Sequence, residues 1–211
     1  MDLKYGNFYK ELPEQEMDVK YLTGKEKVLE IGGNIGRNSL VIASILENSN
    51  NLVTVESDSE IAKQLTENRD LNNKKFYIEN SALSNRKLIQ KDWQTIPSNT
   101  LKKGFKWVNT ITYKQLQQKY KIAFDTLVLD CEGAFYYILK DMPEVLDNIN
   151  LIIMENDYHI SKHKKFIDKR LKKNNFFVDY SEGLTKINSE WKDSPCYNNF
   201  YEVWKKKMSE K

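Results

Sequence analysis

The chain has 211 residues, which is enough for one sizeable domain with a buried core. Apolar residues make up 40% and charged residues 30% of it, proportions that exclude a disordered chain. The net charge of +3 is too small to indicate a nucleic-acid partner by itself, so we expect none. The longest apolar run, 151–154, is too short to span a membrane, and no signal peptide opens the chain. A cytoplasmic protein is therefore expected.

The first expected strand, 27–31, runs directly into a glycine-rich turn. Gly32, Gly33 and Gly36 leave this turn without side chains, and a helix is expected over 38–47. A strand that passes through glycines into a helix lets a ligand lie against bare backbone at the helix N-terminus. The turn therefore predicts a site for a nucleotide-like ligand.

The later elements alternate between strands and helices, which predicts a parallel sheet with helices on both faces. Further strands are expected at 52–55, 76–78, 123–129, 151–154, 176–178 and 200–204. Helices are expected from Ser57 or Asp58, over 112–119, from Ala134, after a capping box at 141–144, and over 162–173. The stretch 80–106, which contains Pro97 and Gly104, is expected to be irregular.

Acidic residues follow four of the expected strands: Glu30, Glu56, Asp130 and Glu155. In such sheets ligands bind at the carboxyl ends of the strands, so these acids are expected at one edge. Glu30 suits a ligand that carries a cation or hydroxyl groups better than it suits a pyrophosphate. Glu56 follows at the distance at which an acid commonly accepts both ribose hydroxyls of an adenosyl group. Its alternative role is that of an acid at a helix N-terminus.

The glycine spacing separates two kinds of cofactor. A dinucleotide fingerprint requires G-x-G-x-x-G, whereas the present turn fits the acid-x-G-x-x-x-G spacing of S-adenosylmethionine (SAM) sites. A small-residue turn at Ser81 and Ala82 suits the adenine ring, with an ordinary loop as the alternative. The expected cofactor-binding residues are Glu30, Gly32, Gly33, Asn34, Gly36, Asn38, Glu56, Ser57, Ser81 and Ala82.

Four short segments follow one another along the chain: Glu-Ile-Gly-Gly-Asn-Ile-Gly at 30–36, Asn-Ser-Ala-Leu at 80–83, Thr-Ile-Thr at 110–112 and Leu-Asp-Cys-Glu-Gly at 129–133. Together they resemble the signatures of FkbM-type SAM-dependent methyltransferases, over residues 28–156. That family commonly has Asp, Ala and an acid where this chain has Glu30, Gly33 and Tyr136. The resemblance implies an α/β, Rossmann-like seven-stranded class I methyltransferase sheet whose last strand is antiparallel. It also implies O-methylation, often of a sugar hydroxyl.

A sugar hydroxyl is a very weak acid, so its methylation needs a proton acceptor or a metal ion. One hypothesis places Mg²⁺ on Asp130, Glu155 and Asn156, which offer hard oxygen ligands at two neighbouring strand ends. In the alternative no metal binds, and Asp130, Glu132 or His159 takes the proton directly. Glu132 has a further structural alternative, in which it binds amides of the following helix turn.

We expect one methyltransferase domain over 1–211. Residues 1–26, with Glu11 and Glu14, are expected to cap the cofactor or substrate, and 85–108 and 181–197 are expected to be insertions on the substrate side. Candidates for a ring-stacking platform, with core packing as the alternative, are Trp93, Trp107, Trp191 and Tyr197.

The expected acceptor is a carbohydrate or another hydroxyl-bearing molecule, such as a small natural product. An RNA ribose 2′-O-methyltransferase is the alternative, and the lysines of 162–173 would then contact the RNA. The same run also fits an amphipathic surface helix with a solvated lysine face. A nucleic-acid partner is disfavoured, and the sequence does not define the oligomeric state.

Overall fold

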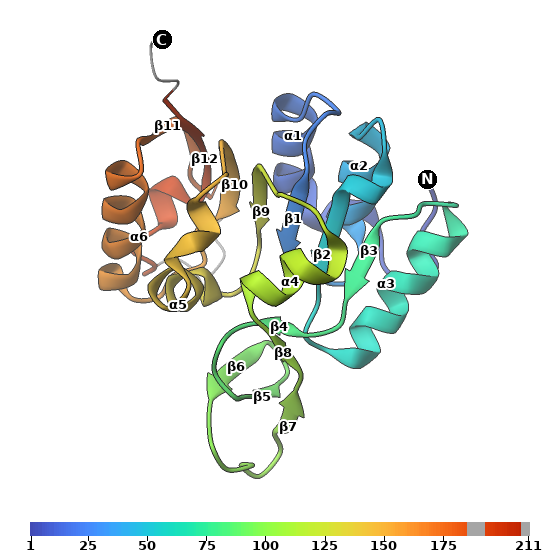
Figure 1. Cartoon of the computed structure of the whole chain (residues 1–211), viewed down its shortest axis with the longest axis horizontal. Helices are drawn as coiled ribbons and strands as arrows, with labels where there is room; N and C mark the ends of the chain where they lie inside the picture. The colour runs from blue at the N-terminus through green and yellow to red at the C-terminus, as the bar shows by residue number, and fades with distance from the viewer. Residues whose placement is uncertain (185–192, 208–211) are drawn as a thin grey trace.

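The structure is a computed structural model that describes residues 1–184 and 193–207. A seven-stranded sheet with the order β11-β12-β10-β9-β1-β2-β3 forms its centre (Figure 1). Its strands are β1 Val28–Ile31, β2 Leu52–Val55, β3 Tyr77–Glu79, β9 Thr126–Leu129, β10 Leu151–Glu155, β11 Phe176–Glu182 and β12 Tyr201–Lys206. Strand β12 runs antiparallel to both of its neighbours, β10 and β11, and all other neighbouring pairs in this sheet are parallel. The expected Rossmann-like sheet with an antiparallel last strand is thus confirmed.

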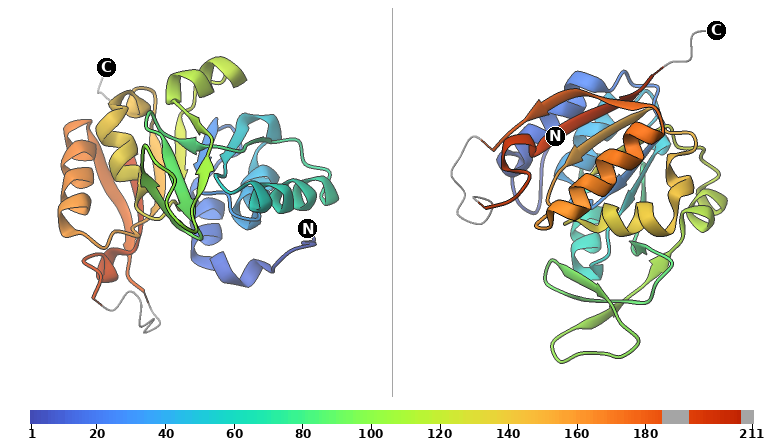
Figure 2. Two further views of the ribbon diagram at one scale, coloured as in Figure 1. Left: turned by 90° about the horizontal axis from the view of Figure 1, so that it is seen from below. Right: turned by 90° about the vertical axis from the view of Figure 1, so that its left-hand side faces the viewer.

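Helices cover both faces of the sheet, as the side views show (Figure 2). They are α1 Leu12–Tyr21, α2 Arg37–Ile45, α3 Ser59–Leu71, α4 Tyr113–Tyr120, α5 Ala134–Asp141 and α6 Ser161–Lys173. Successive strand residues point to opposite faces, so each central strand contributes side chains to two hydrophobic cores, one on each face of the sheet. Leu29 and Ile31 pack in the core with α4, α5 and α6, whereas Val28 packs in the core with α1, α2 and α3.

The segment between β3 and α4 was expected to be irregular, and that expectation is wrong. It contains two small sheets, made by β4 Ala82–Leu83 with β8 Thr110–Ile111, and by β5 Leu88–Lys91 between β6 Gln94–Pro97 and β7 Lys106–Val108. Burial of Leu88 and Ile89 supports β5, and Pro97 ends a strand instead of breaking one. We call residues 84–109 the insertion. It stands below the carboxyl ends of the main strands (Figure 1).

The expected capping box at 141–144 is also wrong. Asp141 is the last residue of α5, and a 3-10 helix at Pro143–Leu146 follows without a side-chain cap. The Asp141 carboxylate binds the guanidinium of Arg86 instead. A capping box does occur at the start of α4, between Thr112 and Gln115. Of the two N-cap candidates for α3, Asp58 has that role.

Two expectations concern the rest of the chain. The second expected insertion, 181–197, includes residues 185–192 and with them Trp191, which lie outside the described residues. Its first two residues belong to β11. Within the described ranges, no helix combines the length and the apolar character needed to cross a membrane.

Candidate cofactor site

The glycine turn after β1 passes very close to the end of β9. Gly32 has a φ of +96°, and a β-carbon there would lie 1.5 Å from the carbonyl oxygen of Asp130. At Gly33 a β-carbon would lie 2.1 Å from Cγ2 of Thr54. The amides of both glycines donate to the carbonyl oxygen of Val55, at 3.0 and 3.1 Å. Only glycine fits this path, which leaves the backbone bare at the edge of the sheet.

Glu56 holds the other side of the turn. Its Oε2 accepts a hydrogen bond from the amide of Asn34 at 2.9 Å, and its Oε1 accepts one from the amide of Asp58 at 2.7 Å. Asp58 itself caps α3 by accepting from the amides of Glu60 and Ile61. The N-cap role considered for Glu56 thus belongs to Asp58. Burial raises the pKa of Glu56 to about 6.

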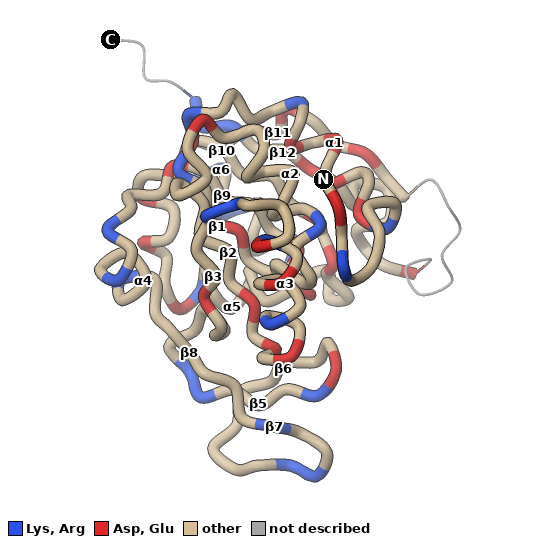
Figure 3. Tube along the Cα trace, turned by 90° about the vertical axis from the view of Figure 1, so that its right-hand side faces the viewer, with Lys and Arg blue, Asp and Glu red and all other residues tan. Residues whose placement is uncertain are grey.

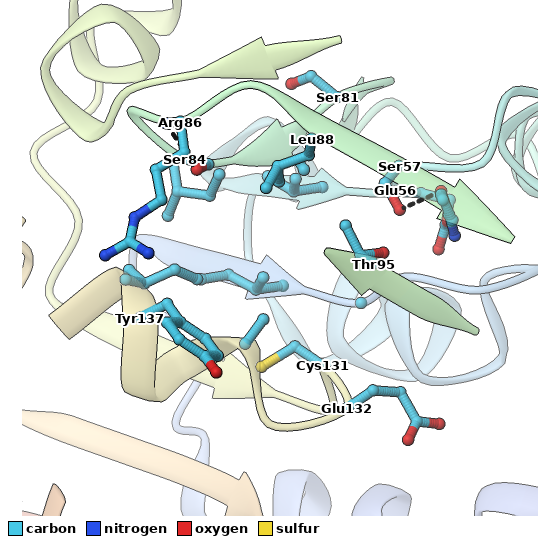
Figure 4. Close-up of a pocket in the computed structure, with 18 of the residues that line it drawn as sticks. Glu56, Ser57, Ser81, Ser84, Arg86, Leu88, Thr95, Cys131, Glu132 and Tyr137 are labelled. Atoms are coloured by element: carbon cyan, nitrogen blue, oxygen red, sulfur yellow. Dashed lines mark hydrogen bonds between the residues drawn. The ribbon is translucent and has the colours of Figure 1, made fainter. Parts of the chain in front are cut away.

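A cavity of about 230 Å³ lies between the strand ends and the insertion (Figure 4). The expected site residues that line it are Gly32, Asn34, Glu56, Ser57, Ser81, Ala82, Asp130 and Glu132. The structure therefore brings together the turn, the acid after β2, the small-residue turn after β3 and the acids after β9.

For the other wall of this cavity, sequence reasoning placed 85–108 on the substrate side and named Trp93, but it missed the remaining residues. Residues of α5 contribute Ala134, Tyr137, Ile138 and Asp141, and the insertion contributes Arg86, Leu88, Gln90, Trp93, Thr95, Ile96 and Pro97. The α5 residues recur at helical spacing directly after the Asp-Cys-Glu-Gly segment, and this spacing could have revealed them. No comparable pattern marks the insertion residues.

The cavity has charged side chains at both ends, carboxylates at one and an ion pair at the other. In Figure 4, Glu56 and Glu132 lie toward one end, and Arg86 and Tyr137 toward the other. Arg86 Nη2 donates to Asp141 Oδ1 at 2.7 Å, and the guanidinium lies 5.6 Å from the centre of the Tyr137 ring. This ion pair fixes Arg86 between the insertion and α5.

Glu30 lies beneath the turn instead of in the cavity. Its buried Oε2 accepts hydrogen bonds from the hydroxyls of Ser39, at 2.5 Å, and Thr54, at 2.7 Å. Burial raises the pKa of Glu30 to about 7, and the two hydroxyls oppose that rise. The expected cofactor residues Gly33, Gly36 and Asn38 also do not line the cavity. Glu30 supports the turn from below.

Three carboxylates from distant parts of the chain meet beside Asp130. Glu14 of α1, Asp130 after β9 and Glu155 at the end of β10 have carboxylate oxygens within 4.8 Å of one another. We call them the acidic cluster. Burial and the neighbouring negative charges raise the pKa values of Asp130 and Glu155 well above their ordinary range. Such a cluster is stabilised by a proton or by a cationic group.

The remaining expected residues lie apart from this cluster. Asn156 is buried, and its Nδ2 donates to the carbonyl oxygen of Asn199 at 2.7 Å while its Oδ1 has no hydrogen-bond partner among the described residues. His159 is exposed in the loop before α6 and does not line the cavity. Buried Asp157 lies near Glu132, and burial raises its pKa to about 7.

The N-terminal segment is fastened to the cofactor turn. Glu11 pairs with Arg37 at the start of α2 and accepts a hydrogen bond from Nδ2 of Asn34 at 3.3 Å. Arg37 Nε also donates to the carbonyl oxygen of Asn7 at 2.9 Å. The expected capping segment therefore contacts the turn directly through polar side chains.

Comparisons with known proteins agree with the fold. No family model and no curated protein matches the sequence. Among solved structures, TrmK of M. capricolum in complex with S-adenosylhomocysteine (SAH) has a TM-score of 0.57 at 9% identity, covering 92% of this chain and 68% of that one. The tRNA (m1A58) methyltransferase TrmI of Aquifex aeolicus has 0.53 at 14%, covering 100% and 73%. The ribosomal protein L11 methylase of Lactobacillus delbrueckii subsp. bulgaricus has 0.53 at 12%, covering 97% and 82%. The fold is thus the Rossmann-like fold of these methyltransferases.

Proposed function

We propose that the protein transfers the methyl group of SAM to a sugar hydroxyl. The observation that carries this proposal is the placement of the Glu56 carboxylate at the wall of a cavity, opposite a turn that only glycine can form. A carboxylate in that position accepts hydrogen bonds from the two ribose hydroxyls of an adenosyl group. One solved structure of the same fold holds SAH, the product of methyl donation by SAM.

The residues around the cavity fit SAM in size and charge. Ser81 and Ala82 leave room for a flat ring, and Ile138 of α5 offers an apolar surface to it. Asp130 also lines the cavity, and the acidic cluster to which it belongs concentrates carboxylates, with raised pKa values for Asp130 and Glu155. A ligand that brings a sulfonium and an ammonium group would stabilise the ionised cluster. NAD, which brings a pyrophosphate, would meet repulsion there.

Oxygen is the acceptor atom that the acidic residues favour. When bound, SAM supplies an activated methyl group, but a hydroxyl must still lose its proton to become an effective nucleophile. Asp130 lines the cavity, and burial together with the negative charges of Asp157 and Glu14 raises its pKa and with it its affinity for a proton. We assign proton acceptance to Asp130, with Glu14 and Glu155 as positioning residues. Glu132 is the second candidate, whereas His159 does not reach the cavity.

A magnesium version of the mechanism remains a separate proposal. The cluster would supply carboxylate oxygens from Glu14, Asp130 and Glu155, which are the ligand type that Mg²⁺ prefers. Asn156, expected as a ligand, uses its Nδ2 in a hydrogen bond to the backbone of Asn199, which leaves its Oδ1 as the atom that a metal would bind. Chelation with EDTA separates the two versions, since it abolishes turnover only where a metal is required.

Two measurements test the proposed function. Calorimetric titration should give saturable binding of SAM and SAH and no binding of NAD. Incubation with methyl-labelled SAM and a panel of oligosaccharides and RNA, followed by digestion to single sugars or nucleosides, should place the label on a sugar oxygen. Label on a base nitrogen or on protein would overturn the choice of acceptor, and absence of SAM binding would overturn the function itself.

A further inference from the structure

The insertion concentrates positive charge beside a cavity wall that is otherwise acidic. It contains six basic residues and one acidic residue, a net charge of +5, whereas the whole chain carries only +3. The rest of the molecule is therefore net negative. The basic residues are Arg86, Lys87, Lys91, Lys102, Lys103 and Lys106, and the acid is Asp92. Figure 3 shows Lys and Arg segments on β7 and on the loop below it.

The last turn of the other lysine-rich element, helix α6, lies away from the cavity. Helix α6 follows β10 and returns along the sheet, so its last turn lies at the edge opposite the carboxyl ends of the strands. That turn holds Arg170, Lys172 and Lys173. The positive charge of this last turn is thus remote from the cofactor site, whereas the insertion carries charge that is close to it.

Strand register separates the two faces of the insertion sheet. Ile89 pairs with both Ile96 and Trp107, so these three side chains share a face with Lys87 and Lys91. The opposite face holds Gln90 and Lys106. Gln90 accepts a hydrogen bond from Ser57 and Lys106 pairs with Asp58, so this second face is turned toward the body of the protein.

Around Ile89, which is itself buried, the first face presents an indole ring and exposed lysines. Trp107 is 47% exposed, and Lys87 and Lys91 are exposed beside it. The loop with Lys102 and Lys103 joins this face, since a β-carbon at Gly104 would lie 3.7 Å from Cδ of Lys91. Within residues 1–184 and 193–207, none of these four lysines forms an ion pair. Their charge is available to a partner.

A second indole connects the insertion to the cavity. Trp93 occupies the turn between β5 and β6, is 59% exposed and lines the cavity. An extended ligand held by the lysines could therefore stack on one ring and pass beside the other into the site. Isolated aromatic rings flanked by cations are typical of single-stranded nucleic-acid sites, in which bases stack and phosphates contact lysines.

We infer that the insertion binds single-stranded RNA and delivers a ribose hydroxyl to the cavity. This inference rests on the proposed function and narrows its sugar to ribose. A neutral oligosaccharide would gain nothing from a net charge of +5. A membrane anchor would need a continuous apolar tip, whereas the two exposed indoles occupy a turn and a strand face with lysines around them. RNA has bases that can stack on the indole rings and phosphates that can pair with the lysines.

Binding of a fluorescein-labelled 12-nucleotide oligouridine, followed by anisotropy at several salt concentrations, tests the inference. In single strands each lysine–phosphate contact contributes about 0.7 to the slope of log K against log[salt]. The double variant Lys102→Gln/Lys103→Gln should therefore lower that slope by about 1.4 and weaken binding about tenfold. Lys172→Gln/Lys173→Gln removes the same charge from exposed positions in the last turn of α6 and should change neither quantity.

Stacking is tested separately from charge. Trp107→Ala should weaken RNA binding about fivefold or more at an unchanged salt slope, and Trp107→Phe should restore most of it. Calorimetry with SAM should be unchanged in each of these variants, which excludes misfolding. Equal losses in the α6 control, equal affinity for dextran sulfate, or binding to phosphatidylserine vesicles instead of RNA would overturn the inference. SAM binding without RNA binding would contradict this inference alone, whereas RNA binding without SAM binding would contradict the proposed function.

Discussion

The carbonyl oxygen of Asp130 occupies the place where a side chain at Gly32 would begin. A β-carbon there would lie 1.5 Å from that oxygen, so any other residue must push β1 and β9 apart at the edge where the cavity opens. The relationship links the cofactor turn to the acidic cluster, because Asp130 lies against the turn with its carbonyl oxygen and belongs to the cluster with its carboxylate. A substitution that moves the turn is therefore expected to change the geometry of the acidic cluster, and the reverse.

Gly32→Ala should destabilise the protein by more than about 3 kcal/mol and abolish SAM binding, because neither backbone segment can yield locally. Urea unfolding and calorimetry measure the two effects. Gly104→Ala is the matched control, since its φ of +80° is equally unfavourable for alanine but its nearest neighbour would lie 3.7 Å away. It should cost about 1–2 kcal/mol and leave SAM binding intact. Equal effects would mean that backbone strain, and not the close approach, requires glycine.

Glu56→Ala should raise the Kd for SAM about tenfold or more, because hydrogen bonds to a carboxylate are stronger than neutral ones. Part of that loss comes from the turn, since the amide of Asn34 loses its acceptor. Asp58→Asn keeps the cap on α3 and removes a charge next to Glu56, so it controls for electrostatics. Its SAM affinity should stay near that of the wild type. If both variants bind SAM normally, Glu56 is no ribose ligand.

The ligand-free protein should lose stability as the pH rises from about 4.5 to about 7. Burial raises the pKa of Glu30 from 4.5 to about 7, so in this window the folded state binds a proton that the unfolded state has released. The loss from Glu30 alone amounts to about 3 kcal/mol and is complete above its folded pKa. Urea unfolding at pH 5 and pH 8 should show it. Glu30→Gln should reduce the dependence by the share of Glu30, since the buried Glu56 and Asp157 contribute in the same sense, and an unchanged pH slope in that variant would contradict the assignment.

Asp130→Asn should lower kcat at least about a hundredfold while SAM still binds, because general-base catalysis contributes factors of that size. His159→Gln should stay within about twofold of the wild type, since His159 does not line the cavity. A large loss in the histidine variant, with turnover retained in the aspartate variant, would reverse the assignment of the base.

Glu14→Gln distinguishes proton acceptance from metal binding. The negative charge of Glu14 helps to raise the pKa of Asp130, so removing it should move the acidic limb of the pH–kcat profile to lower pH while activity persists. If the cluster holds Mg²⁺, the same variant should lose activity unless magnesium is added in excess, and EDTA should abolish turnover of the wild type. A profile that does not move and activity that resists EDTA would exclude Glu14 from both roles.

Sequence patterns predicted the central strands β1, β2, β9 and β10 well, because each is a mostly apolar, buried run that ends at a turn or an acid. The same reasoning brought Asp130 and Glu155 to one edge, as the structure does. Glu14 escaped notice as their partner, because its position depends on how α1 packs against β10 and not on any local pattern. Glu30 was assigned to the ligand, yet the hydroxyls of Ser39 and Thr54 draw it beneath the turn.

The insertion is held at its neck by two short parallel strands. The amide of Ala82 donates to the carbonyl oxygen of Asn109 at 2.8 Å, and that of Ser84 to Ile111 at 2.9 Å. Because both ends of the loop are fastened next to the small-residue turn, residues between them can be replaced or lengthened without moving Ser81 and Ala82. Natural variation, or a grafted hairpin, could then change which acceptor is recognised while the donor pocket keeps its shape.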